Sequence, residues 1–428
     1  MIITKKSFFR IILYLVISIV IFFLTLNNST SFDIVVCRIL AMILFFYCIT
    51  KGSFEDTIFN PYYFFSLVPL SLSLYSSNVS TYYLNDLNIS TWVIALTNIF
   101  AFLVGLGLTS RKRYSDVYID YAGIETYKSL VNDSIILFLL GRIPSIYEMI
   151  TGNSFFLTSI MQLFTYGAIV CAMKSKNKTI IAAITVLLVG SMLMSSINKT
   201  SVLFLAMTYG ISYYCFYVES ERQKRNMMAL IVVFSIFFIF ILFPLKDYMT
   251  GGTSISGFFS SDLTSTFKYY ESRINWSGNK LLYMPYMYFV QAWNNLQYVI
   301  ETQNTRTYGL WILKPLIGYF QLDGGLESFY TLTSYSSFNT FTYITVFFKD
   351  FGYWFSWIGS FLLGGFVGRV YKHKLLLSNS ALDLACYSLT ACATLEMFFS
   401  NHFFMQSYPF TILIIMFIYK KCRNALRK

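Results

Sequence analysis

The side chains with the clearest chemical potential in this chain are cations in or between apolar segments. Five stand out, one inside an apolar segment, one in a short turn between two of them and three in a long polar stretch: Arg142, Lys199, Arg273, Lys280 and Arg306. A guanidinium binds phosphate through two parallel hydrogen bonds, and an ammonium binds it as a point charge. We predict that Arg273 takes part in catalysis and that the other four bind an anionic substrate.

Two further residues could accept a proton from a substrate hydroxyl. Asp350 lies where the polar stretch returns to an apolar segment, in the run Lys349-Asp350-Phe351-Gly352, and His402 follows the next apolar segment. A carboxylate or a neutral imidazole at such a position can act as a general base. We predict both as catalytic residues. For Asp350 the alternatives are orienting an arginine, capping its helix or pairing with Lys349.

The polar stretch also offers aromatic rings, and Trp276 is the one predicted to contact a sugar face. Trp and Tyr also concentrate at membrane interfaces for structural reasons, which is the alternative for this residue. The two arginines of the stretch have an alternative as well, because Arg273 is near Glu271 and Arg306 is near Glu301 in the sequence. Loop ion pairs would then account for them.

Several signatures of other chemistries are missing. The sequence has no Asp-x-Asp sugar-nucleotide motif, no Gly-rich phosphate loop and no Gly-x-Ser-x-Gly elbow, and it contains only two His. A metal site built from soft ligands is therefore not expected. We predict that the protein works without a metal or another cofactor.

The composition predicts an all-α polytopic membrane protein. Hydrophobic residues make up 56% of the 428 residues and charged residues only 12%, whereas soluble proteins carry roughly 25% charged residues. Apolar runs of about 20 residues can cross a bilayer as helices. We predict about 12 spans, near residues 8–26, 34–50, 61–75, 91–109, 135–150, 155–173, 179–194, 201–218, 227–245, 352–370, 383–400 and 405–419.

The basic residues set the expected topology. Most of the 32 Lys and Arg fall in alternate connectors and at the two ends, so the net charge of +12 reflects the positive-inside rule. Both termini are then cytoplasmic, and nucleic-acid binding is not expected. The chain divides into nine spans in 1–245, a large periplasmic loop in 246–340 and three spans in 341–428.

Three local features refine this topology. Two apolar pieces of the loop, Lys280 to Ile300 and Tyr308 to Phe320, are predicted as helices lying at the membrane interface. Ser360, Gly364 and Gly368 recur every four residues and predict a close helix contact. An arginine at the depth of Arg142 costs at least about 2.5 kcal/mol in lipid, so it must face protein or water. It could grip an anionic headgroup or pair with another span.

The order of these features resembles the Wzy-type polymerases, which join O-antigen or capsule repeat units. The similar points are Asn60-Pro61-Tyr62 at the third span, the basic turn at Lys199 and one dominant outer loop. The run from Asn339-Thr340 through Asp350-Phe351-Gly352 to Gly364 and Tyr371 is similar to the return of that family into the membrane.

The resemblance implies a glycosyltransferase of the membrane-embedded C-type fold in the bacterial inner membrane. It would polymerise repeat units linked to undecaprenyl pyrophosphate at the periplasmic face, as a step of lipopolysaccharide or capsule biosynthesis. Its implied partners are these lipid-linked glycans, the lipid bilayer, a chain-length regulator and a flippase. An O-antigen ligase, and a lipid-linked oligosaccharide flippase or other transporter, stay open as alternatives.

Overall fold

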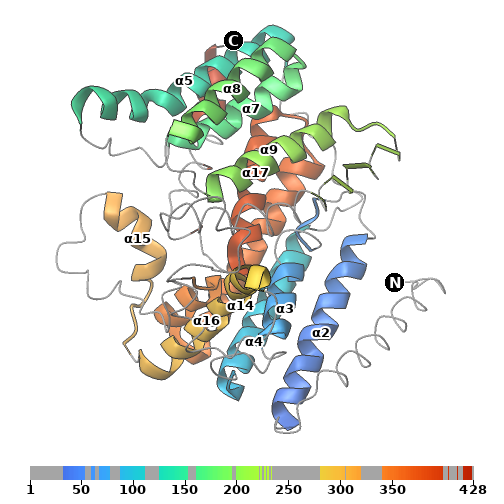
Figure 1. Cartoon of the computed structure of the whole chain (residues 1–428), viewed down its shortest axis with the longest axis vertical. Helices are drawn as coiled ribbons and strands as arrows, with labels where there is room; N and C mark the ends of the chain where they lie inside the picture. Colours follow the sequence, from blue (N-terminus) through green and yellow to red (C-terminus); the bar gives the residue numbers. More distant parts are fainter. Residues whose placement is uncertain are drawn as a thin grey trace.

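The computed structural model describes eleven stretches of the chain and a few single residues. The stretches are 32–53, 59–62, 67–77, 87–110, 125–152, 161–194, 199–220, 280–303, 305–319, 340–398 and 418–426, and the single residues lie between 222 and 233 and at 403 and 412. Within these residues every regular element is a helix (Figure 1). The expected spans 8–26, 227–245 and 405–419 lie wholly or largely outside them, as do Arg273, Trp276 and His402.

Four of the described helices are long and apolar enough to cross a membrane. They coincide with the expected spans 34–50, 91–109, 135–150 and 383–400, and the last continues into the short helix η5 (Glu396–Phe398). They are α2 (Phe32–Ser53), α4 (Ile89–Ser110), α5 (Tyr127–Thr151) and α17 (Ala381–Leu395). The all-helical membrane class is thereby supported, while the full set of twelve spans stays a prediction.

The remaining described helices are shorter or less apolar. The expected spans 61–75, 155–173, 179–194 and 201–218 overlap α3, α7, α8 and α9, and the span 352–370 forms the second part of α16. These helices are α3 (Leu67–Ser76), α7 (Phe164–Ser175), α8 (Lys178–Met194), α9 (Lys199–Tyr217), α14 (Lys280–Thr302), α15 (Leu310–Tyr319), α16 (Tyr343–Val370), η4 (Tyr371–Leu376) and α20 (Lys420–Leu426).

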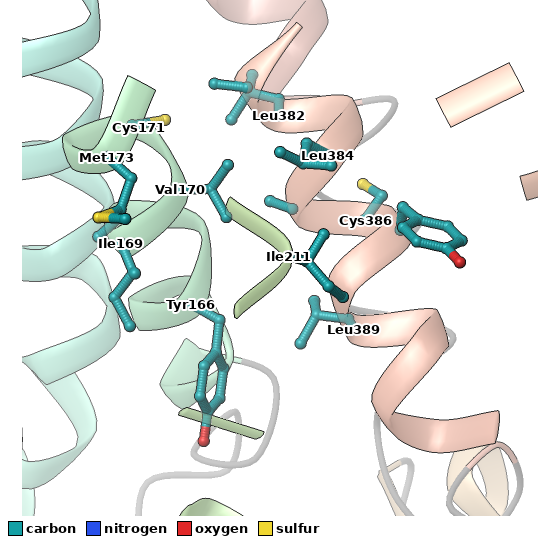
Figure 2. Close-up of a cluster of buried hydrophobic side chains, with 14 of the residues drawn as sticks. Tyr166, Ile169, Val170, Cys171, Met173, Ile211, Leu382, Leu384, Cys386 and Leu389 are labelled. Carbon is teal, nitrogen blue, oxygen red and sulfur yellow. The ribbon is translucent and has the colours of Figure 1, made fainter. Parts of the chain in front are cut away.

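One hydrophobic core forms where α5, α7, α9 and α17 meet (Figure 2). Apart from Lys174, every residue of α7 is buried, because α5 covers one side of it and α9 and α17 cover others. The approach of α5 to α7 is close: a Cβ at Gly141 would lie 2.5 Å from Cγ2 of Thr165. Ser134 adds a hydrogen bond of 3.0 Å to the carbonyl oxygen of Ala168.

The second core is built around the contact of α4 with α16. A Cβ on Gly364 would lie 2.1 Å from the carbonyl oxygen of Phe102, and one on Gly368 would lie 2.2 Å from Oγ1 of Thr109. Ser360 donates a hydrogen bond of 2.5 Å to Oδ1 of Asn98, which is buried between the helices. The close-packing face predicted from Ser360, Gly364 and Gly368 is confirmed, since only glycine leaves room for the facing backbone.

Polar contacts join the starts of α5 and α17. Glu125, just before α5, forms an ion pair of 2.5 Å with Lys174 and accepts hydrogen bonds from Oγ of Ser380 and the backbone nitrogen of Ala381. The three expected connectors that meet here carry the basic residues Lys128, Lys174, Lys372 and Lys374, which the charge pattern assigns to one side of the membrane. The structure brings these connectors together.

Part of the helix α14 is buried against other helices. Residues 290–297 are all buried, and α14 belongs to the second core together with α2, α3, α4 and α16. Its polar groups bond to other elements: Nε1 of Trp293 donates to Oγ of Ser73 at 3.0 Å, and Oε1 of Gln297 accepts from the backbone nitrogen of Asn88 at 2.8 Å. These polar groups therefore have protein partners, and the position of α14 at the membrane interface stays a prediction.

The α4–α16 contact yields a paired prediction. We expect Gly364→Ala to lower the stability of the detergent-purified protein by about 1–3 kcal/mol, because the new methyl group meets the backbone of α4. Gly365→Ala is the matched control, since the nearest atom to its Cβ would be Cγ2 of Thr109 at 3.8 Å, an ordinary contact. Thermal unfolding midpoints check this, and equal midpoints for the two variants would contradict it.

Candidate functional site

A break in α16 at Gly352 organises the site. Gly352 has φ 70° and ψ −163°, a conformation that side chains other than hydrogen rarely adopt. The break deprives the preceding carbonyl groups of helical partners. Backbone nitrogens of the loop before α15 replace them: that of Thr307 donates to the oxygen of Lys349, and that of Tyr308 to the oxygen of Asp350, both at 3.2 Å. The loop is thereby docked on the broken helix.

Asp350 fixes the start of α15. Its carboxylate, fully buried, accepts hydrogen bonds from Oγ1 of Thr307 at 2.6 Å and from the backbone nitrogens of Trp311 and Ile312, both at 3.0 Å. The negative charge sits at the positive end of the α15 dipole, which stabilises both. Asp350 therefore caps α15 rather than its own helix, and its role as a base stays a prediction.

Arg306 and Lys349 form a pair of neighbouring cations beside the break. The guanidinium of Arg306 lies 4.6 Å above the ring of Phe348, and its Nη1 donates to the carbonyl oxygen of Gln303 at 3.3 Å. Nζ of Lys349 donates to Oε1 of Gln303 and Oγ1 of Thr305, both at 3.1 Å. A Cβ at Gly352 would lie only 2.8 Å from Nε of Arg306, so the glycine also makes room for the guanidinium.

The pair is short of negative charge. Among the described residues, all oxygens that contact the two cations belong to neutral groups. Burial and the charge of Arg306 lower the pKa of Lys349, and burial lowers the pKa of Arg306. Neither residue lies in the four candidate spans. An anion bound between them would relieve this repulsion and replace lost hydration.

Two alternatives from the sequence are not what the structure contains. Glu301 accepts a hydrogen bond of 2.7 Å from Nδ2 of Asn88, and the contacts of Arg306 are to other groups, so no ion pair joins Arg306 to Glu301. Lys349 likewise bonds to Gln303 and Thr305 instead of pairing with Asp350. Both cations are thus kept available by the way the loop folds onto α16.

Arg142 occupies a different part of the molecule. It lies on α5, and its guanidinium is 5.4 Å from the ring of Phe138. Phe138 packs against the first core, whereas Arg306 and Lys349 flank the second. Figure 1 shows α5 at the top of the view, well above α15 and α16. The described contacts of Arg142 therefore do not bring it to Arg306.

The other predicted residues are placed only in part. Lys199 is the first residue of α9 and Lys280 the first of α14, and their side chains lie outside the described atoms. Arg273, Trp276 and His402 lie outside the described residues. Within the part of the chain that is described, no group of three or more His, Cys, Asp or Glu residues could hold a metal ion.

Lys349 is a further functional candidate. From the sequence it was expected only as a possible partner for Asp350. The sequence carried a signal for it, because Lys349 precedes Asp350 and lies three residues before Gly352, in the most motif-like run of the chain. The neutral oxygens around it come from Gln303 and Thr305, more than 40 residues earlier. Only the folded loop shows that Lys349 lies near Arg306, with Gln303 contacting both.

Comparison with known proteins adds no relative: no family model, no curated protein and no solved structure matches this chain.

The Asp350 cap gives the second prediction. We expect Asp350→Ala to destabilise the protein by roughly 1–3 kcal/mol, because three donors lose a buried partner. Asp350→Asn should cost less, since an amide oxygen still accepts. Amide hydrogen exchange of residues 307–319 should rise in both variants, and Thr305→Ala is the control that leaves the cap intact. Loss of activity in Asp350→Asn at unchanged exchange and unfolding midpoint would instead identify the carboxylate as a base.

Proposed function

We propose that this chain is a membrane glycosyltransferase that polymerises oligosaccharide repeat units carried on undecaprenyl pyrophosphate, at the periplasmic face of the bacterial inner membrane. The observation that carries the proposal is the pair Arg306 and Lys349, two neighbouring cations whose described contacts are all neutral. Such a pair suits a diphosphate, and the adjacent membrane helices suit its lipid tail.

The reaction explains why cations are needed. A hydroxyl oxygen of the acceptor sugar attacks the anomeric carbon of the donor, and the bond from that carbon to the pyrophosphate oxygen breaks. The leaving pyrophosphate gains negative charge as the bond breaks, while the acceptor proton passes to a base. Preorganised donors aimed at the developing charge are usually the largest single contribution to such a rate. Arg306 and Lys349 would supply them without a metal.

The other predicted residues take roles around this pair. Asp350 and His402 are the candidate bases, and Arg273 is the candidate for a further contact to the leaving group. Arg142, Lys199, Lys280 and Trp276 are the candidates for binding the remaining substrate. The attachment of the loop to α16 supports the choice of Arg306, because the two residues that follow it are hydrogen-bonded to the helix break and so position its guanidinium before the substrate arrives.

Removal of the gene from its native host tests the function. We expect surface glycan resolved on a gel to show a single repeat unit on the lipid core, because flipping and ligation continue when polymerisation is lost. Complete absence of repeat units on the core would contradict the polymerase and indicate a ligase or a carrier. Finished polymer accumulating on the lipid carrier would then single out the ligase.

Variants of the cation pair test the site. We expect Arg306→Gln and Lys349→Gln each to lower polymerisation by on the order of 10²-fold, the typical loss when one donor to a developing oxyanion is removed. Arg306→Lys should retain only part of the polymerisation activity, because lysine lacks the two parallel donors of a guanidinium. Lys178→Gln, which removes an exposed charge at the start of α8, is the control. Polymer of normal length and amount in both site variants would contradict the assignment.

A further inference from the structure

A group of buried polar side chains on α14 has no role in the site described above. Gln291 is fully buried and neither its Nε2 nor its Oε1 has a hydrogen-bond partner. Asn294 is 5% exposed and Thr340 is 8% exposed, and Oδ1 of Asn294 and Oγ1 of Thr340 also have no hydrogen-bond partner among the described residues. A buried polar atom without a partner costs its desolvation energy, so four of them in one region need an explanation.

These atoms lie in one region because of helix geometry and one hydrogen bond. Gln291, Asn294 and Asn295 are spaced i, i+3 and i+4, so they share a face of α14. Nδ2 of Asn295 donates to the carbonyl oxygen of Thr340 at 2.7 Å, which holds the start of the chain into α16 against this face. We call Gln291, Asn294 and Thr340 the amide patch.

The neighbours of the patch show that α14 is not generally short of partners. Trp293 bonds to Ser73, and Gln297 bonds to Asn88, each at 3.0 Å or less. The unpartnered atoms are thus confined to the side of α14 that faces Thr340. They are two amides and a hydroxyl without formal charge, so they match the hydroxyl and acetamido groups of a neutral sugar better than an anion.

The patch and the cation pair are linked through the chain: Gln291 and Asn294 lie on α14, which is followed by the loop with Arg306, and Thr340 comes just before α16, which carries Lys349. Gln303, which contacts both Arg306 and Lys349, ends the segment that begins with α14, and it follows Gln291 by twelve residues. At 1.5 Å per residue, Gln291 lies about 18 Å along the helix from that end. An oligosaccharide of a few sugars spans such a distance.

We propose that the amide patch binds an uncharged sugar of the lipid-linked oligosaccharide whose pyrophosphate is held by Arg306 and Lys349. The patch is closed in this structure, so a sugar reaches it when the segment carrying Thr340 moves away from α14 and the bond from Asn295 to Thr340 breaks. The sugar then supplies the partners that Gln291, Asn294 and Thr340 lack. This proposal rests on the proposed function for the identity of the ligand.

A binding experiment with two probes tests the patch separately from the function. The probes are the free repeat-unit oligosaccharide, released from the surface glycan of the host by mild acid, and inorganic pyrophosphate. Both are titrated into the full-length protein in nanodiscs. We expect Gln291→Leu to weaken the oligosaccharide about tenfold or more, through the loss of one or two hydrogen bonds, and to leave pyrophosphate binding unchanged. Arg306→Gln should weaken pyrophosphate binding and leave the affinity for the oligosaccharide unchanged.

Stability supplies the second readout. Gln291→Leu should raise the thermal midpoint, because it removes two unpartnered buried atoms while keeping the volume filled. Thr208→Val is the matched control: Thr208 lies on α9, a helix that contributes to the first core, and its buried Oγ1 has no hydrogen-bond partner among the described residues. This variant should raise the midpoint and leave both probes bound. Loss of pyrophosphate binding in Gln291→Leu would mean that this variant is misfolded. In that case Asn294→Leu replaces it, and the same two affinities and the thermal midpoint are measured.

The outcomes separate this proposal from the function. Oligosaccharide affinity that is unchanged in Gln291→Leu and Asn294→Leu, or absent in the unmodified protein, overturns the amide patch even if the deletion strain carries a single repeat unit. A deletion strain with normal polymer overturns the polymerase, whatever the binding data. Selective loss of the oligosaccharide with retained pyrophosphate binding supports the patch.

Discussion

The helix break at Gly352 is the constraint on which the second half of the described structure depends. An unbroken α16 would use the carbonyl oxygens of Lys349 and Asp350 within the helix, and the loop before α15 would lose its two backbone anchors. Glycine is required both for the backbone angles and for the space that Arg306 occupies. The carboxylate of Asp350 completes the junction by capping α15. The run from Lys349 to Gly352 thus connects α16, the loop before α15 and α15 itself.

The charge arrangement follows from that junction. Because Asp350 is committed to donors of the α15 start, and Glu301 to Asn88, the nearby cations Arg306 and Lys349 are left with neutral oxygens. Water or an anion is the natural partner for such a pair. The proposed binding of a diphosphate therefore follows from two facts. The nearby carboxylates are bonded to other groups, and the two cations lie close together.

The two hydrophobic cores differ in how much polar surface they bury. The core of α5, α7, α9 and α17 contains mostly apolar side chains and carries Arg142 beside it, whereas the core around α4 and α16 also buries the polar side of α14. A polar face in a core is stable only where partners are provided, as for Trp293 and Gln297. The side-chain atoms of Gln291 and Oδ1 of Asn294 have no such partners among the described residues, which is why a ligand is proposed there.

The sequence by itself determined the class of structure and several positions in it. Apolar length specified the helices α2, α4, α5 and α17, and four-residue spacing specified the contact through Gly364 and Gly368, because both depend on local pattern. It also singled out the run around Asp350. Tertiary structure alone decided that Asp350 caps α15, that Lys349 lies near Arg306 with Gln303 between them in contact with both, that Arg142 lies elsewhere and that residues 290–297 of α14 are buried. The physical reason is that hydrogen bonds and ion pairs depend on which residues distant in sequence meet. Gln303 and residues 305–312 meet 349–352 only after the loop has folded onto the broken helix.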